Sequence, residues 1–115
     1  MDRTPRVSLS MRGTVGIISM TGDLTDSVDS ILLQFHKEAL SKGAKHLLLK
    51  IHPKSFINSA GIRSILSLVF AAEAVKQSVG VVGLSPHMNQ IFDLVGLHQY
   101  LKVYSSEPET LKDWK

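Results

Sequence analysis

The seven residues Phe56-Ile57-Asn58-Ser59-Ala60-Gly61-Ile62 return the chain to the core and then open a helix that we expect to reach about Lys76. Asn58 or Ser59 can cap this helix, because a short polar side chain accepts hydrogen bonds from the free N–H groups of the first turn. One apolar stripe follows at helical spacing, formed by Ile62, Ile65, Leu66, Val69 and Ala72 and widened by Leu68, Ala71 and Val75. A largely buried helix that follows a short apolar stretch is typical of α/β proteins.

Three strands and one helix are predicted ahead of this junction. Residues 7–11 alternate between apolar and polar, which indicates a half-buried strand, and residues 15–20 form a second, more apolar strand after a Gly-Thr turn signal. In residues 25–42 the apolar residues recur at helical spacing, which predicts a helix. Residues 45–51 contain three consecutive leucines, a pattern that predicts a central strand covered on both faces.

After the junction, predicted strands and helices continue to alternate along the chain. Residues 78–84 predict a strand, Ser85-Pro86 begins a short helix to Val95, residues 101–104 predict an edge strand, and residues 108–114 predict a terminal helix. We therefore expect one domain over residues 1–115, with a mostly parallel sheet and one antiparallel strand supplied by the first hairpin.

Composition excludes several classes of protein. The 115 residues include no cysteine, so disulfides, zinc-thiolate sites and thiol nucleophiles are excluded. The net charge is +3, but the basic residues are scattered and do not alternate with aromatic residues, so we expect no nucleic-acid partner. The start of the chain lacks the apolar run of a signal peptide, and no apolar stretch approaches the roughly 20 residues of a membrane span. We expect a cytoplasmic protein without membrane insertion.

No residue pattern indicates catalysis. Ser59 has no Gly-x-Ser-x-Gly context, and we predict that the protein is not an enzyme, with no catalytic residue and no cofactor. The histidines show no pair at metal-ligand spacing, so we predict no metal site and place them in surface or loop positions: His36, His46, His52, His87 and His98.

Ser59 carries the functional interpretation. Taken alone, the polar pair Asn58-Ser59 ahead of Gly61 is best explained as a helix cap. However, a serine at a helix N-terminus can also carry a phosphate, because the free N–H groups and the positive end of the helix dipole accommodate an anion without disturbing the fold. Gly61 would then let the backbone of a partner approach closely.

Four segments in order resemble one family. Residues 57–62 are similar to the Asp-Ser-Ser/Thr-Gly-Leu signature of STAS domains, the family of bacterial anti-sigma factor antagonists. Gly22-Asp23-Leu24 resembles the family's Gly-x-Leu motif, residues 82–86 its fourth strand and Ser-Pro helix start, and residues 91–97 its third helix. The resemblance implies a STAS-like fold, a four- to five-stranded mixed sheet with helices mainly on one side.

The resemblance also implies regulation by partner switching. In such families the unphosphorylated antagonist binds a serine kinase of the histidine-kinase-like ATPase fold that is also the anti-sigma factor. Phosphorylation of the motif serine releases the antagonist, and a phosphatase resets it. The matching serine is Ser59, and Asn58 stands where the family has Asp. The expected partner-binding residues are Asp23, Thr25, Asn58, Ser59, Ala60, Gly61 and Arg63.

Two alternatives stay open. The same helix N-terminus can hold a nucleotide phosphate or another anion, which would make the protein a ligand-binding module. The chain can also be a non-phosphorylated STAS scaffold or a transporter-associated STAS subunit, since the substitution of Asn58 for Asp removes a charge next to the acceptor serine.

Overall fold

The main sheet has five strands in the order β1-β2-β4-β6-β7. β1 pairs with β2 antiparallel, and the remaining pairs are parallel. The computed structural model describes residues 3–114. The strands are β1 (Arg6–Arg12), β2 (Val15–Thr21), β4 (His46–Ile51), β6 (Ser78–Val82) and β7 (Lys102–Val103). The predicted mixed sheet, with an antiparallel hairpin at its edge, is therefore confirmed.

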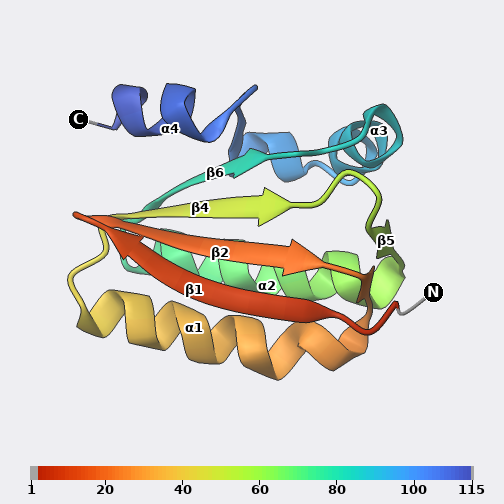
Figure 1. Cartoon of the computed structure of the whole chain (residues 1–115), viewed down its shortest axis with the longest axis horizontal. Helices are drawn as coiled ribbons and strands as arrows, with labels where there is room; N and C mark the ends of the chain where they lie inside the picture. Colours follow the sequence, from red (N-terminus) through yellow and green to blue (C-terminus); the bar gives the residue numbers. More distant parts are fainter. Residues whose placement is uncertain (1–2, 115) are drawn as a thin grey trace.

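Helices connect the parallel strands. They are α1 (Asp29–Ser41), α2 (Ser59–Ala74), α3 (Pro86–Leu94) and α4 (Glu107–Asp113), with the 3-10 turns η1 (Asp26–Val28) and η2 (Leu97–Gln99). Figure 1 shows α1 and α2 together against one face of the sheet and α4 apart from them, beside β6. Helices mainly on one side are thus confirmed.

The core has two parts, one on each face of the sheet. The larger part lies under α1, α2 and α3 and includes Ile18, Leu49, Leu68 and Phe92, all fully buried. The smaller part lies on the opposite face, where Leu111 and Trp114 of the α4 region pack on Val15, Ile17, Leu48, Val82 and Tyr104. In β4, Leu48 is buried in the smaller part of the core, whereas Leu47 and Leu49 are buried in the larger part on the opposite face. The prediction that this strand is central and covered on both faces is therefore confirmed.

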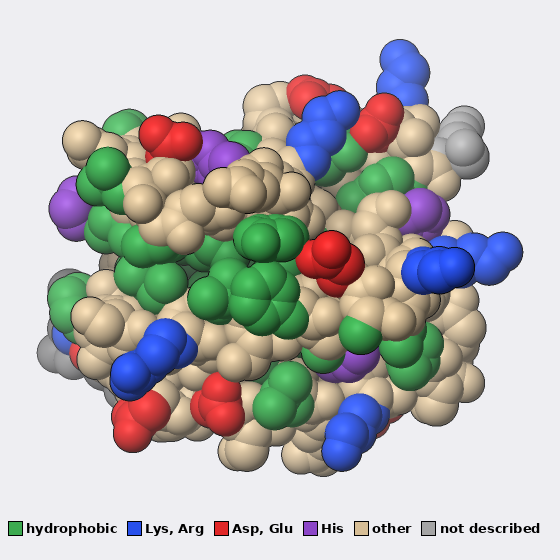
Figure 2. All heavy atoms as spheres, turned by 180° about the vertical axis from the view of Figure 1, so that it is seen from behind, with side chains coloured by type: hydrophobic (Ala, Val, Ile, Leu, Met, Phe, Trp, Pro, Cys, Tyr) green, Lys and Arg blue, Asp and Glu red, His purple; other side chains and the backbone are tan. Residues whose placement is uncertain are grey.

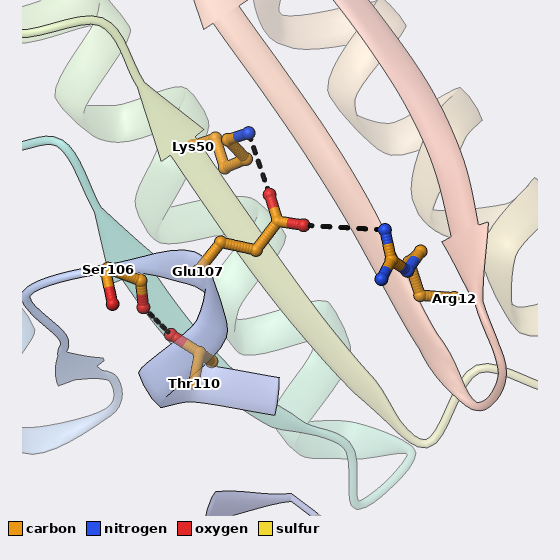
Figure 3. A network of polar contacts seen from close by, with 5 residues as sticks. All are labelled: Arg12, Lys50, Ser106, Glu107 and Thr110. Carbon is orange, nitrogen blue, oxygen red and sulfur yellow. Dashed lines mark hydrogen bonds and ion pairs between the residues drawn. The ribbon is translucent and has the colours of Figure 1, made fainter. Parts of the chain in front are cut away.

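Polar contacts also attach α4 to the sheet. Figure 3 shows Glu107, the first residue of α4, between Lys50 of β4 and Arg12 of β1, with Nζ–Oε1 and Nη1–Oε2 distances of 2.7 and 4.0 Å. Within the first turns of α4, the Thr110 hydroxyl donates to the carbonyl oxygen of the N-cap Ser106 at 3.0 Å. Exposed ion pairs contribute about 0–1 kcal/mol each, so the apolar contacts of Leu111 and Trp114 stabilise the attachment more.

Some expectations about exposure are wrong. Phe56, expected in the core, is 50% exposed, because it alternates with Ile57 in the two-residue strand β5 (Phe56–Ile57) and points to the other side. Val75, assigned to the apolar stripe, is 44% exposed because α2 has ended at Ala74. β5 itself pairs in parallel with β3 (Asp23–Leu24), and this small second sheet was not predicted.

The surface position expected for His36 is also wrong. His36 lies on the inner side of α1 and is 6% exposed. Its Nε2 atom is 2.8 Å from the side-chain oxygen of Gln77, and the Gln77 amide nitrogen donates to the Ala44 carbonyl oxygen at 2.8 Å. These two bonds join α1 and the loop after it to the loop after α2, and they satisfy polar groups that would be costly to bury unpaired.

Candidate partner-docking site at the amino end of α2

The small sheet places two helix starts next to each other. In its register Asp23 lies opposite Phe56 and Leu24 opposite Ile57. The residues that follow the two strands, Thr25 and Asn58, are the N-caps of η1 and α2. Two segments far apart in the sequence therefore expose their first helical turns on the same edge of the molecule.

Asn58, and not Ser59, caps α2. Its backbone is extended and its side-chain oxygen accepts from the Gly61 N–H at 2.9 Å. Ser59 is the first residue of α2 and its side chain is exposed. Within residues 3–114, the Ser59 hydroxyl makes no hydrogen bond. Because the cap is supplied by the residue before it, Ser59 can be modified without removing a contact that holds the helix.

Gly61 has a structural role within the chain. It is buried, and a side-chain carbon built on it would lie 2.0 Å from the Leu24 carbonyl oxygen. The same carbonyl accepts the Asn58 N–H at 3.2 Å. We expected the missing side chain to admit a partner, but the chain's own β3 occupies that space.

The structure brings the other predicted residues to this edge. Asp23 is half-buried, and its Oδ1 atom lies 2.6 Å from the Arg3 Nε atom. The Thr25 hydroxyl oxygen accepts from the Ser27 N–H at 3.3 Å. Ala60 is half-buried beside Ser59, while Arg63 is exposed one turn further along α2, on the same side as Ser59.

An apolar stripe, which the sequence analysis did not assign to this site, continues from Ser59 along α2. Ile62, Leu66 and Phe70 follow Ser59 at intervals of three and four residues, so they share its helix face. Ile62 and Leu66 are half-buried, and Phe70 is 46% exposed with its ring edge-on to Tyr100 at 5.1 Å. Figure 2 shows hydrophobic side chains gathered in the middle of the molecular face on the α2 side of the sheet. The spacing from Ser59 was the available signal, but the sequence analysis assigned Ile62 and Leu66 to the buried stripe of the same helix and did not consider Phe70.

Other kinds of site have less support in the described part of the chain. No group of three or more His, Asp or Glu side chains between residues 3 and 114 is placed to hold a metal ion. Over the same residues, no helix combines the length and apolar character needed to cross a bilayer. The surface around Ser59 is a candidate for protein contact because it combines an exposed hydroxyl at one end with apolar side chains along the helix.

Similar solved structures share this fold. An anti-sigma factor antagonist from Mycobacterium paratuberculosis superposes with a TM-score of 0.75 at 16% identity, over 98% of this chain and 96% of that one. The anti-sigma factor antagonist SpoIIAA in its unphosphorylated form gives 0.74 at 21% identity, over 94% and 95% of the two chains. The Bacillus cell fate determinant SpoIIAA in its phosphorylated form gives 0.71 at 19% identity, over 96% and 100%. At these identities the likeness establishes the fold.

The sequence itself establishes the family. Residues 7–104 match the family model described as "Mlab, STAS domain", which covers the main sheet, the first three helices and the whole candidate site. The protein belongs to the STAS domain family.

Proposed function

We propose that the protein is an anti-sigma factor antagonist that acts by partner switching, with Ser59 as the phosphoacceptor. The observation that carries this proposal is the position of Ser59. It is exposed, it is the first residue of α2, and its hydroxyl has no partner within residues 3–114, because Asn58 caps the helix. The Ser59 hydroxyl is therefore accessible to a kinase at the start of a helix. Docking to a partner requires no catalytic group on this chain.

The surface around Ser59 supports binding to a folded partner. Ile62, Leu66 and Phe70 add apolar area along the same helix face, and Arg63 adds a charge. Protein interfaces typically combine an apolar centre with a polar rim. The proposed partner is an anti-sigma factor that is also a serine kinase of the histidine-kinase-like ATPase fold, with a phosphatase that resets Ser59.

Phosphorylation would act by local charge. A phosphate adds about −1.5 to −2 charges at neutral pH, and the N–H groups at the start of α2 can receive it without a change of fold. SpoIIAA has been solved in unphosphorylated and phosphorylated forms, and both superpose on this chain, with TM-scores of 0.74 and 0.71. This similarity supports the argument that a phosphate can be added without a change of fold. The bulk and charge of the phosphate would then block a partner from the face of α2.

A non-phosphorylated STAS subunit of a larger assembly, as a scaffold or a transporter component, is the second candidate. One observation favours it: residue 58 is Asn, so the uncharged cap gives a kinase no carboxylate next to the acceptor serine. In that case the same face of α2 would bind its partner permanently.

Intact-mass analysis separates the two candidates. The protein is incubated with ATP and a serine kinase of the histidine-kinase-like ATPase fold, and the kinase is shown to be active on a known substrate. One added phosphate that is absent in Ser59→Ala, and retained in the control Ser67→Ala on the exposed side of α2, supports partner switching. No added phosphate contradicts phospho-control and favours the permanent subunit.

A further inference from the structure

β1 is a long edge strand of the main sheet. It stands at one end of the strand order β1-β2-β4-β6-β7, and its 7 residues pair one to one with β2 without a bulge. The strand at the other end, β7, has only 2 residues. In Figure 1 no helix or loop crosses in front of β1. Proteins commonly protect such an edge with a proline, a bulge or charged side chains, but β1 has no proline, and its charged residues stand only at its two ends.

The outward backbone groups of this edge belong to Val7, Leu9 and Met11. The Met20 carbonyl oxygen accepts from the His52 N–H at 3.0 Å, so Met20 of β2 bonds on the β4 side and not to β1. Val7 lies opposite Met20, and its own N–H and C=O therefore point away from β2. Because the bonding pattern of an antiparallel pair alternates, the same holds for Leu9 and Met11. Within residues 3–114, these outward groups bond to no other segment.

The same edge carries apolar side chains. Val7, Leu9 and Met11 are half-buried and pack on the larger part of the core, on the face of the sheet that α1 covers. Ile31 and Phe35 of α1 are half-buried as well, and they lie four residues apart, so they share one flank of the helix. Since α1 packs on β1, backbone groups that can still form bonds and partly exposed apolar side chains occur along one edge.

The sequence of β1 is nearly the same in both directions. Read from either end, Arg6–Arg12 runs arginine, apolar, serine, leucine, serine, apolar, arginine. Antiparallel pairing with a second copy, centred on Leu9, would place Leu9 opposite its own counterpart and Val7 opposite Met11. In this register the outward backbone groups of the two strands meet in hydrogen-bonded pairs. The strand is therefore self-complementary, as a two-fold interface requires.

We propose that the protein forms a two-fold dimer in which β1 pairs antiparallel with β1 of a second copy. The two five-stranded sheets then join into one, and the half-buried side chains of β1 and α1 become part of a shared core. Removal of this apolar surface from water drives the association. Neither Ser59 nor any other residue of the docking surface lies in β1, so the proposal does not rest on the proposed function.

The arginines at the two ends of β1 oppose this pairing and give it a signature. Arg6 would lie opposite Arg12 of the second copy, and like charges directly opposite each other are destabilising. The cost is limited because both side chains are engaged within their own chain: Arg12 lies 4.0 Å from Glu107, and Arg6 also has an interaction there. Salt screens the remaining repulsion, so the dimer should tighten as the ionic strength rises.

The test combines sedimentation equilibrium of the full chain, between about 1 µM and 1 mM, with amide hydrogen exchange. We expect a monomer–dimer equilibrium that shifts toward the dimer at higher salt. In the dimer, the amides of Val7, Leu9 and Met11 should exchange about tenfold more slowly than in the monomer. Those of Ser8 and Ser10, which already bond to β2, should change little. A monomer at every concentration overturns the proposal, and so does a dimer without this protection.

Charge variants at the two serines make the test specific, because Ser8 would face Ser10 of the second copy on the exposed side of β1. Ser8→Lys combined with Ser10→Lys sets like charges opposite each other and should weaken the dimer about tenfold. Ser8→Lys combined with Ser10→Glu sets opposite charges there and should keep or tighten it. The control, Asn89→Lys combined with Gln90→Lys, adds the same charge on the exposed side of α3 and should leave dimerisation unchanged. Equal dimerisation of the two serine variants, or an equal loss in the control, would refute the pairing.

Discussion

The carbonyl oxygen of Leu24 lies where the side chain of residue 61 would begin, 2.0 Å from a side-chain carbon built on Gly61. This approach locks the start of α2 against β3, and with it the position of Ser59 relative to Asp23 and Thr25. The backbone at the start of the proposed docking surface is thus held by this contact.

Gly61→Ala should destabilise the protein by about 1–3 kcal/mol, the usual cost of overpacking, although alanine is otherwise the better helix former. Urea unfolding measures this change. Ser67→Ala, which places an alanine at an exposed position of the same helix, is the control. A stability of Gly61→Ala equal to or above that of the parent would refute the close approach.

Asn58→Ala should lower the free energy of unfolding by about 1 kcal/mol, because the cap to the Gly61 N–H is lost. Asn58→Asp should keep the cap and add a charge favourable to the helix dipole. Ser59→Ala serves as the matched control and should be neutral in the same urea titration. If Ser59→Ala costs as much as Asn58→Ala, the assignment of the cap is wrong.

Gln77→Leu should cost about 2 kcal/mol or more, because it leaves both a ring nitrogen of His36 and the Ala44 carbonyl oxygen buried without a partner. Gln34→Leu, on the exposed side of α1, is the control for adding an apolar side chain. Thermal unfolding of the two variants compares them directly. Equal melting temperatures would show that the polar contact between the loops after α1 and α2 contributes nothing.

Tyr104 should make stability depend on alkaline pH. Burial, followed by the hydrogen bond to Asp113 and the carboxylates of Asp113 and Glu109, raises the pKa of Tyr104 from 10.0 to about 12. The folded state holds the phenol proton more tightly than the unfolded state. The resulting stabilisation, about 2–3 kcal/mol, is complete below pH 10 and lost as the pH rises to about 12.

Phenolate absorbance in a Tyr100→Phe variant follows Tyr104 alone, because the chain has 2 tyrosines. Urea unfolding at several pH values should show the loss of stability in this variant and a weaker pH dependence once Tyr104→Phe is added. Titration of Tyr104 near 10 in the folded protein would contradict the burial of its hydroxyl beneath α4.

Much of the fold follows from sequence periodicity. The alternation in residues 7–11, the three leucines of β4 and the Ser85-Pro86 cap each predict their element from the local sequence. β3 and β5 could not be predicted, because two-residue strands have no period and form only when the ends of β2 and β4 bring them together. His36 was misplaced because only its partner Gln77, 41 residues away, makes its burial tolerable.

The candidate site was predicted in part. The motif around Ser59 located the start of α2, but sequence could not decide whether Asn58 or Ser59 is the cap, since both residue types can accept from the first turn. The role of Gly61 was also out of reach, because it depends on a carbonyl oxygen 37 positions earlier, that of Leu24.

Binding of Ser59 variants to the proposed anti-sigma factor kinase tests the central claim most directly. Isothermal titration calorimetry with ADP present compares the parent, Ser59→Ala, Ser59→Asp and the control Ser67→Asp, which places the same charge on an exposed helix position outside the stripe. The account predicts that Ser59→Ala binds as the parent does, that Ser59→Asp binds at least tenfold more weakly, and that Ser67→Asp is close to the parent. Equal affinity of Ser59→Ala and Ser59→Asp would contradict a charge switch at Ser59.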